Sequence, residues 1–130
     1  MKKLDVNLIN VIVLAYLGDT IYENYVRKYL ISTGINNVKE LQEKSINYVS
    51  ALGQAKYVKE LMEINFFYED ELSVIMRARN NSNNRHPKNC DIMSYKYATG
   101  LEALIGYLDI CGNKNRIEEI MNYILRWLFC

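Results

Sequence analysis

Apolar residues recur every three or four positions along almost the whole chain, and this spacing constrains the fold more than any other feature of the sequence. Such a period places apolar side chains on one face of a helix, whereas a strand requires a period of two. The single proline, Pro87, and the glycines Gly34 and Gly112 stand where the pattern is interrupted. The sequence therefore predicts an all-α fold of about six or seven helices. The predicted helices cover approximately residues 6–30, 37–48, 51–62, 69–79, 94–111 and 115–128.

The length and the cysteine content indicate one domain in a reducing compartment. A chain of 130 residues can form one hydrophobic core, so we expect a single domain over residues 1–130. The N-terminal apolar run is interrupted by asparagines and is too short to span a bilayer, so no membrane segment is expected. Cys90, Cys111 and Cys130 are odd in number and widely spaced, which favours free thiols in a cytoplasmic protein over disulfides or a zinc site.

Two carboxylates stand out because each interrupts an apolar helical pattern. Asp19 follows Gly18 at the end of a long uncharged stretch, and Glu102 lies within an otherwise apolar run that contains Gly106. A lone ionised carboxylate on an apolar helix is costly unless it is paired, hydrogen-bonded or bound to a metal. The small residues beside both acids would let another helix come close.

Two carboxylates from separate helices offer the oxygen ligands that Mg²⁺ prefers, provided that the fold brings them together. Magnesium binding by Asp19 and Glu102 is therefore one prediction. The alternative, which spacing alone leaves open, is that each acid pairs with an arginine or caps a helix. Glu23 lies one turn after Asp19 and is a candidate supporting residue, although at this spacing we expect it rather to pair with Arg27.

A second candidate site is the basic, asparagine-rich stretch from Arg77 to Lys96, which begins at the end of the fourth predicted helix and includes the loop after it. Arginine and lysine neutralise phosphates, and asparagine bonds to sugar and base edges. The candidate RNA-binding residues are Arg77, Arg79, Arg85, Lys88 and Asn89. The alternative is a solvated loop without a ligand. Because the net charge is only +1, any nucleic-acid surface has to be local.

The sequence argues against several other catalytic designs. Its one histidine, His86, lies in the basic segment without a serine or cysteine constellation around it, so a histidine-based triad is not expected. No glycine-rich phosphate loop or dinucleotide fingerprint occurs either. Asp19 and Glu102 remain the candidate reactive groups.

The segments around both carboxylates resemble the ribonuclease III family. Residues 14–23, LAYLGDTIYE, are similar to the signature helix of that family, and residues 101–106, LEALIG, are similar to its second acidic motif. Residues 77–80 and 87–89 resemble segments of its compact branch, called mini-ribonuclease III, which residues 48–51 and 54–55 also fit. The resemblance extends from about residue 8 to residue 108, and motifs in this order and spacing make it specific.

The resemblance implies an all-helical catalytic domain that dimerises and cleaves both strands of an RNA duplex with Mg²⁺, leaving 5′-phosphate and 3′-hydroxyl ends. For the compact branch it implies maturation of the large-subunit (23S) ribosomal RNA precursor, held in the context of a ribosomal protein, by a domain without a double-stranded-RNA-binding module. Asp19 and Glu102 would be the catalytic metal ligands. With a net charge near zero, we expect weak and salt-sensitive binding to naked duplex.

The chain departs from the larger members of the family, whose sites use four acidic residues. Ala15 stands four positions before Asp19, and Thr99, a candidate supporting residue, stands three before Glu102. The reduced acidic set is the best support for a rival hypothesis, a non-catalytic helical RNA-binding or ribosome-assembly factor on the same scaffold. Retention of both remaining carboxylates opposes that hypothesis. A helical protein-interaction adaptor is a third possibility, but it explains neither the acids nor the basic segment.

Overall fold

The computed structural model describes residues 5–81 and 90–126, and every regular element in these ranges is helical. A 3₁₀ turn, η1 (Val6–Leu8), precedes six α-helices. They are α1 (Val11–Ser32), α2 (Val38–Val49), α3 (Ala51–Glu63), α4 (Glu69–Asn81), α5 (Ile92–Ile110) and α6 (Lys114–Leu125). The predicted all-α class is confirmed. No helix among the described residues is both long and apolar enough to cross a membrane.

Polar caps decide where the helices begin, and they correct two predicted boundaries. The side chain of Asn10 accepts a hydrogen bond from the Ile12 amide at 2.8 Å, so α1 begins at Val11 and the preceding turn is separate from it. Asp91 accepts from the Ser94 amide at 2.8 Å, so α5 begins two residues before the predicted position. In both cases the cap satisfies backbone donors that the helix itself leaves unpaired.

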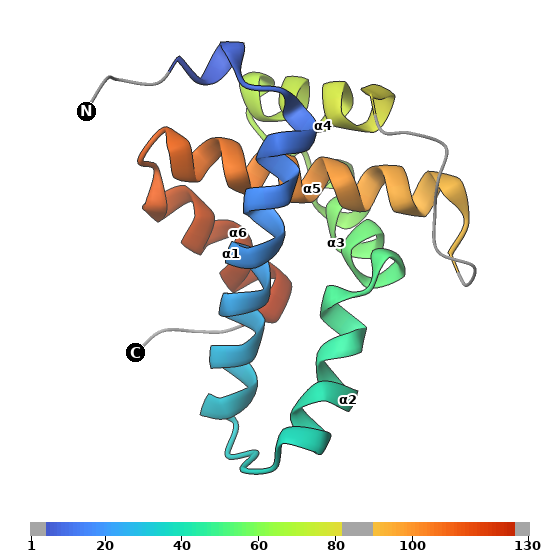
Figure 1. Cartoon of the computed structure of the whole chain (residues 1–130), viewed down its shortest axis with the longest axis vertical. Helices are drawn as coiled ribbons and strands as arrows, with labels where there is room; N and C mark the ends of the chain where they lie inside the picture. The colour runs from blue at the N-terminus through green and yellow to red at the C-terminus, as the bar shows by residue number, and fades with distance from the viewer. Residues whose placement is uncertain (1–4, 82–89, 127–130) are drawn as a thin grey trace.

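The architecture centres on α5, which the other long helices cover (Figure 1). The helix α1 crosses α5 and shares the most extensive interface with it, while α3 and α4 pack against α5 as well. The helix α2 lies alongside α1 and α3, and α6 contacts both α5 and α1. Ten of the residues of α5 are buried, which explains why its sequence reads as almost continuously apolar.

The buried face of α1 differs at its N-terminal end from the face that the sequence predicts. In the predicted helix over residues 6–30, the three- and four-residue spacing of apolar residues places Leu8 and Ile12 on the buried face, but they are 84% and 39% exposed. Val11, Leu14 and Gly18 are buried instead. The reason is that α1 starts only at Val11 and that its rotation is set by the close contact with α5, so the residues one position earlier face the core.

A buried ion pair joins α4 to α6. The guanidinium of Arg116 donates from Nε and a terminal nitrogen to the carboxylate of Glu71, each at 2.9 Å. The same guanidinium lies 4.3 Å from the ring centroids of Phe66 and Tyr68 and donates to the Phe66 carbonyl at 2.6 Å. Because the buried charge is paired and its donors are used, this cluster fixes how the segment between α3 and α4 packs on α6.

Candidate active site

Two glycines allow the backbones of α1 and α5 to touch beside the two acidic residues. A Cβ atom on Gly18 would overlap the carbonyl group of Glu102, and a Cβ atom on Gly106 would overlap the carbonyl group of Leu14. Only glycine fits at either position without moving a helix, because its missing side chain allows this approach. The contact holds the segment that carries Asp19 against the segment that carries Glu102.

Asp19 and Glu102 meet at this crossing. Asp19 is exposed and Glu102 is half-buried, and both a side-chain hydrogen bond with Asp19 and the negative charge of Asp19 act on Glu102. In the described ranges the ion pairs are Glu23–Arg27, Glu71–Arg116 and Glu119–Arg116, so no arginine neutralises either carboxylate of the crossing. Two neighbouring carboxylates without a cationic partner repel each other when both are ionised.

The environment of Glu102 strongly disfavours its charged form. Burial is the largest cause that raises the pKa of Glu102, to about 9, and the hydrogen bond and negative charge of Asp19 raise it further. A hydrogen bond from Gln54 acts in the opposite direction, and Glu23 contributes a smaller electrostatic increase. A carboxyl group that holds a proton at neutral pH beside a second carboxyl group is the state expected of a cation site without its cation.

Gln54 and Tyr22 also interact with Glu102. The amide Nε2 of Gln54, on α3, lies 3.5 Å from Oε2 of Glu102, and the Gln54 side chain is 2% exposed. Tyr22 is fully buried one turn after Asp19, and its hydroxyl donates to the Tyr48 carbonyl at 2.7 Å. Burial is the main cause that raises the pKa of Tyr22, with Glu102 among the charges that add to it.

The two candidate supporting residues do not contact the carboxylate pair directly. Glu23 lies 3.7 Å from Arg27 in an exposed ion pair, which is the pairing expected from its spacing, and it acts on Glu102 only through its charge. The hydroxyl of Thr99 donates to the Tyr95 carbonyl one turn earlier in α5, at 2.9 Å. This bond occupies the hydroxyl hydrogen within the helix backbone.

The donor set suits a hard divalent cation that keeps much of its water. Carboxylate oxygens are the ligands that Mg²⁺ prefers, and this ion is commonly held by one or two carboxylates with waters completing the shell. Among residues 5–81 and 90–126, no group of three or more histidine, cysteine, aspartate and glutamate side chains lies close enough to hold a metal. The described site is therefore a pair of carboxylates, too sparse for an all-protein cage but sufficient for a hydrated ion.

The basic residues at the end of α4 lie in a different environment. Arg77 is exposed. Arg79 donates to the Tyr97 hydroxyl at 3.1 Å and to the Asn80 side chain, and its guanidinium lies 5.5 Å from the centroid of the Tyr97 ring. Lys59, which sequence reasoning did not identify, lies over the same ring at 5.1 Å. Arg85, Lys88 and Asn89 lie outside the described residues.

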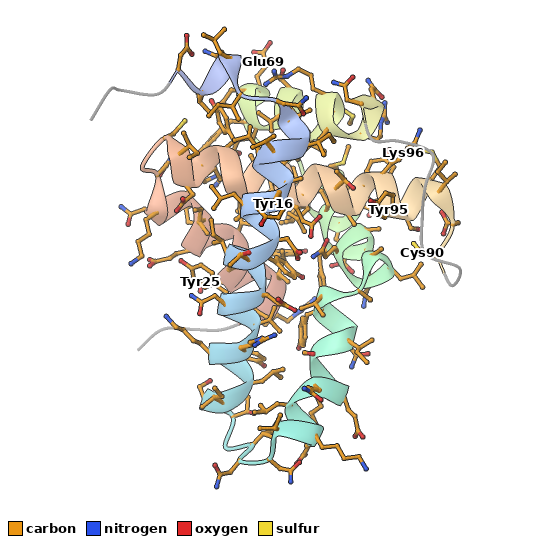
Figure 2. All side chains as sticks on the ribbon, viewed as in Figure 1. Tyr16, Tyr25, Glu69, Cys90, Tyr95 and Lys96 are labelled. Carbon is orange, nitrogen blue, oxygen red and sulfur yellow. The ribbon has the colours of Figure 1, made fainter. Side chains whose placement is uncertain are left out.

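This cationic group stands near the start of α5, where Lys96 and Tyr95 project (Figure 2). Lys59 comes from α3 and Arg79 from α4, and they converge on Tyr97 of α5. Lys59 was missed because α3 is far in the sequence from the basic segment, and nothing in the spacing distinguishes Lys59 from its neighbour Lys56. Only the packing of three helices places its charge beside that of Arg79.

Replacing Glu102 with glutamine should stabilise the metal-free protein at neutral and alkaline pH. Because the folded pKa of Glu102 lies near 9 and the unfolded value near 4.5, the folded state holds a proton that the unfolded state has lost. The stability of the wild-type protein should therefore fall as pH rises between these two values. Glu102→Gln stays neutral throughout, so we expect it to gain about 1–3 kcal/mol at pH 8. Urea unfolding in EDTA at pH 5 and pH 8 measures this, and an equal difference at both values would contradict it.

Comparisons with known proteins identify the family of the chain. The model of the ribonuclease III domain matches residues 12–113, which include both carboxylates. The chain is 36% identical to Mini-ribonuclease 3 of Streptococcus pneumoniae, over 95% of this chain and 96% of that protein. It is 44% identical to Mini-ribonuclease 3 of Brevibacillus brevis, over 90% of this chain and 86% of that protein.

A solved structure has the same fold. A crystal structure of a protein from Fusobacterium nucleatum superposes with a TM-score of 0.81 at 34% identity, covering 91% of this chain and 94% of that one. Both the sequence relatives and the structural neighbour extend over nearly the whole chain. The chain therefore belongs to the ribonuclease III family, in its compact mini-ribonuclease III branch.

Proposed function

We propose that this protein is a magnesium-dependent ribonuclease that matures the precursor of 23S ribosomal RNA, with Asp19 and Glu102 as its catalytic metal ligands. Membership of the ribonuclease III family makes it an endoribonuclease for double-stranded RNA, which leaves 5′-phosphate and 3′-hydroxyl ends. Enzymes of this family generally use a divalent metal. The identity of the ion, the ribosomal precursor, the cytoplasmic location and the roles of individual residues belong to the proposal.

One observation carries the assignment of the site. Asp19 and Glu102 come from helices that cross at a glycine contact, and their carboxyl groups meet without a cationic side chain between them in the described ranges. A protein that used these residues only for structure would gain stability from neutralising one of them. The pair is therefore better explained by an external cation than by folding.

The proposed mechanism assigns separate tasks to the two carboxylates. Asp19 is exposed, so its oxygens would be accessible to the bound RNA. Glu102 is half-buried and hydrogen-bonded to Gln54, so it would supply a fixed ligand. A bound divalent cation provides the positive charge that phosphodiester hydrolysis needs on the attacking water and on the leaving oxygen. To bind it, Glu102 has to release its proton to solvent.

Substrate binding is assigned to the basic residues. Arg77 and Arg79 would contact phosphates at the end of α4, and we keep Arg85, Lys88 and Asn89 in the same role as predictions from the sequence. An A-form duplex would be recognised mainly through its shape, its phosphates and its 2′-hydroxyl groups, since its major groove is too narrow for side chains. A single catalytic domain over residues 1–130 and assistance from a large-subunit ribosomal protein also remain predictions.

The exposed face of α1 supports the proposed homodimer. Val13 and Tyr16 lie on successive turns and are 58% and 84% exposed, and Ile12 beside them is also exposed. Tyr16 projects from α1 in the half that crosses α5 (Figure 2). Apolar surface of this kind is a frequent feature of protein interfaces. A second copy seated on this strip would lie one helical turn from Asp19.

The proposed function predicts cleavage that depends on both duplex structure and a divalent cation. We expect the wild-type protein to cut a long RNA duplex in Mg²⁺ and to leave either separated strand intact. EDTA should abolish cleavage, and added Mg²⁺ should restore it, because the described site offers no cationic side chain to replace the ion. Gel electrophoresis with end-labelled RNA also reports the chemistry of the ends.

Two outcomes would decide against the proposal. Cleavage that continues undiminished in EDTA would remove the metal from the mechanism. No cleavage of any duplex, together with retained RNA binding, would favour the rival hypothesis of a non-catalytic RNA-binding factor on the same scaffold.

A further inference from the structure

A buried glutamine on α3 has no evident structural reason to be polar. Gln54 is 2% exposed and shares one face of α3 with Val58 and Leu61, which are fully buried. Burying an amide costs free energy unless it is hydrogen-bonded, and an apolar residue at this position would avoid that cost. The partner of the amide therefore indicates what the residue does.

Among the described residues, the other buried polar side chains are used within the scaffold. Ser94 bonds to the cap of its own helix, Thr99 bonds to the backbone of α5, and Glu71 pairs with Arg116. Gln54 differs because its Nε2 faces Oε2 of Glu102 across the boundary between α3 and α5, at 3.5 Å. It is the described residue that links the scaffold to the proposed metal ligand.

We infer that Gln54 is a positioning residue, whose amide holds the carboxylate of Glu102 in the orientation that binds the divalent cation; this inference rests on the proposed function. The amide donates to one carboxylate oxygen and leaves the other oxygen for the cation. Long hydrogen bonds of this kind in a ligand-free site commonly tighten when the ligand binds.

The geometry also explains why the donor comes from α3. Among the described residues, the hydrogen-bond partners of the Glu102 carboxyl group are Gln54 of α3 and Asp19 of α1, so no side chain of α5 itself orients the carboxylate. Asp19 repels the ionised carboxylate and would turn it away from the site. A neutral donor fixed on a third helix resists that movement without adding charge. Outer partners that orient a metal ligand typically contribute 10–100-fold to metal affinity or activity.

The test is the affinity for Mn²⁺, used as the probe cation, measured by isothermal titration calorimetry. We expect Gln54→Met to weaken Mn²⁺ binding by about tenfold, since it keeps the volume of the side chain but removes the donor. Gln42→Met, the same substitution at an exposed position of α2, is the matched control and should bind as wild type does. The unfolding free energy of both variants in EDTA should stay close to the wild-type value.

Cleavage as a function of Mg²⁺ concentration provides the second measurement. The half-saturating Mg²⁺ concentration of Gln54→Met should rise about tenfold, while the rate at saturating Mg²⁺ returns close to that of wild type. A merely structural defect would instead lower the plateau at every concentration. If Gln54→Met fails to fold, Gln54→Asn retains the amide but withdraws it by one methylene, and the same shift is expected.

The results separate this inference from the proposed function. If wild type and Asp19→Asn bind Mn²⁺ equally well, the metal site itself is wrong and the role of Gln54 is overturned with it. If Asp19→Asn loses Mn²⁺ binding but folded Gln54 variants bind within about twofold of wild type, only the role of Gln54 is overturned.

Discussion

Asp19→Asn should lower duplex cleavage by more than about 100-fold while leaving the protein folded. The substitution keeps the size of the side chain and removes one of the two negative charges that would hold the cation. Replacing outer partners of metal ligands already costs up to about 100-fold, so loss of a direct ligand should cost more. The exposed position of Asp19 means that no packing is lost.

In Asp19→Asn the cleavage rate should fall, whereas the stability of the folded protein should stay equal or rise. Removing the charge of Asp19 relieves Glu102 of a repulsive neighbour, so unfolding in EDTA should occur at equal or higher denaturant concentration than in wild type. Asp109→Asn, which removes an exposed carboxylate of α5 about two turns after Glu102, is the control and should cleave like wild type. Full activity of Asp19→Asn would refute the assigned catalytic role.

Gly18→Ala should disrupt the fold and the site together. The added Cβ atom would overlap the carbonyl group of Glu102, so α1 and α5 have to separate along their largest interface. We expect the unfolding free energy to fall by about 3 kcal/mol, at the upper end for overpacked cores, because the obstacle is backbone and cannot change rotamer. Cleavage and Mn²⁺ affinity should fall as well, since the separation moves Asp19 from Glu102.

Gly34→Ala is the matched control for this substitution. Gly34 has a positive φ of 98° and no atom within 4 Å of the added Cβ, so its replacement costs only backbone strain, about 1–2 kcal/mol. The cleavage rate of Gly34→Ala, divided by the fraction of molecules that are folded, should equal that of wild type. Equal effects of the two substitutions on Mn²⁺ affinity would show that the helix crossing does not position the carboxylates.

Local patterns were sufficient to predict most of the helices. The spacing of apolar residues identified six helical segments. The second was predicted from residue 37, and the side chain of Asn37 accepts from the Glu40 amide at 3.1 Å at the start of that helix. The largest error fell at the start of α1, Val11, because a single capping side chain decides such a boundary, and several helix ends differ from the predicted residue by two or three positions. Local propensity does not reveal which of several polar residues performs that task.

The sequence by itself also selected the two acids, because a charge within an apolar helix is conspicuous wherever that helix packs. It could not show that Asp19 is exposed while Glu102 is half-buried, that Gln54 faces Glu102, or that Lys59 joins Arg79 at Tyr97. These relations depend on how α1, α3 and α4 are rotated against α5. The close approach of the α1 and α5 backbones at Gly18 and Gly106 sets the rotation of α1. Residue spacing determines which side of a helix a residue occupies, whereas only tertiary packing determines what that side meets.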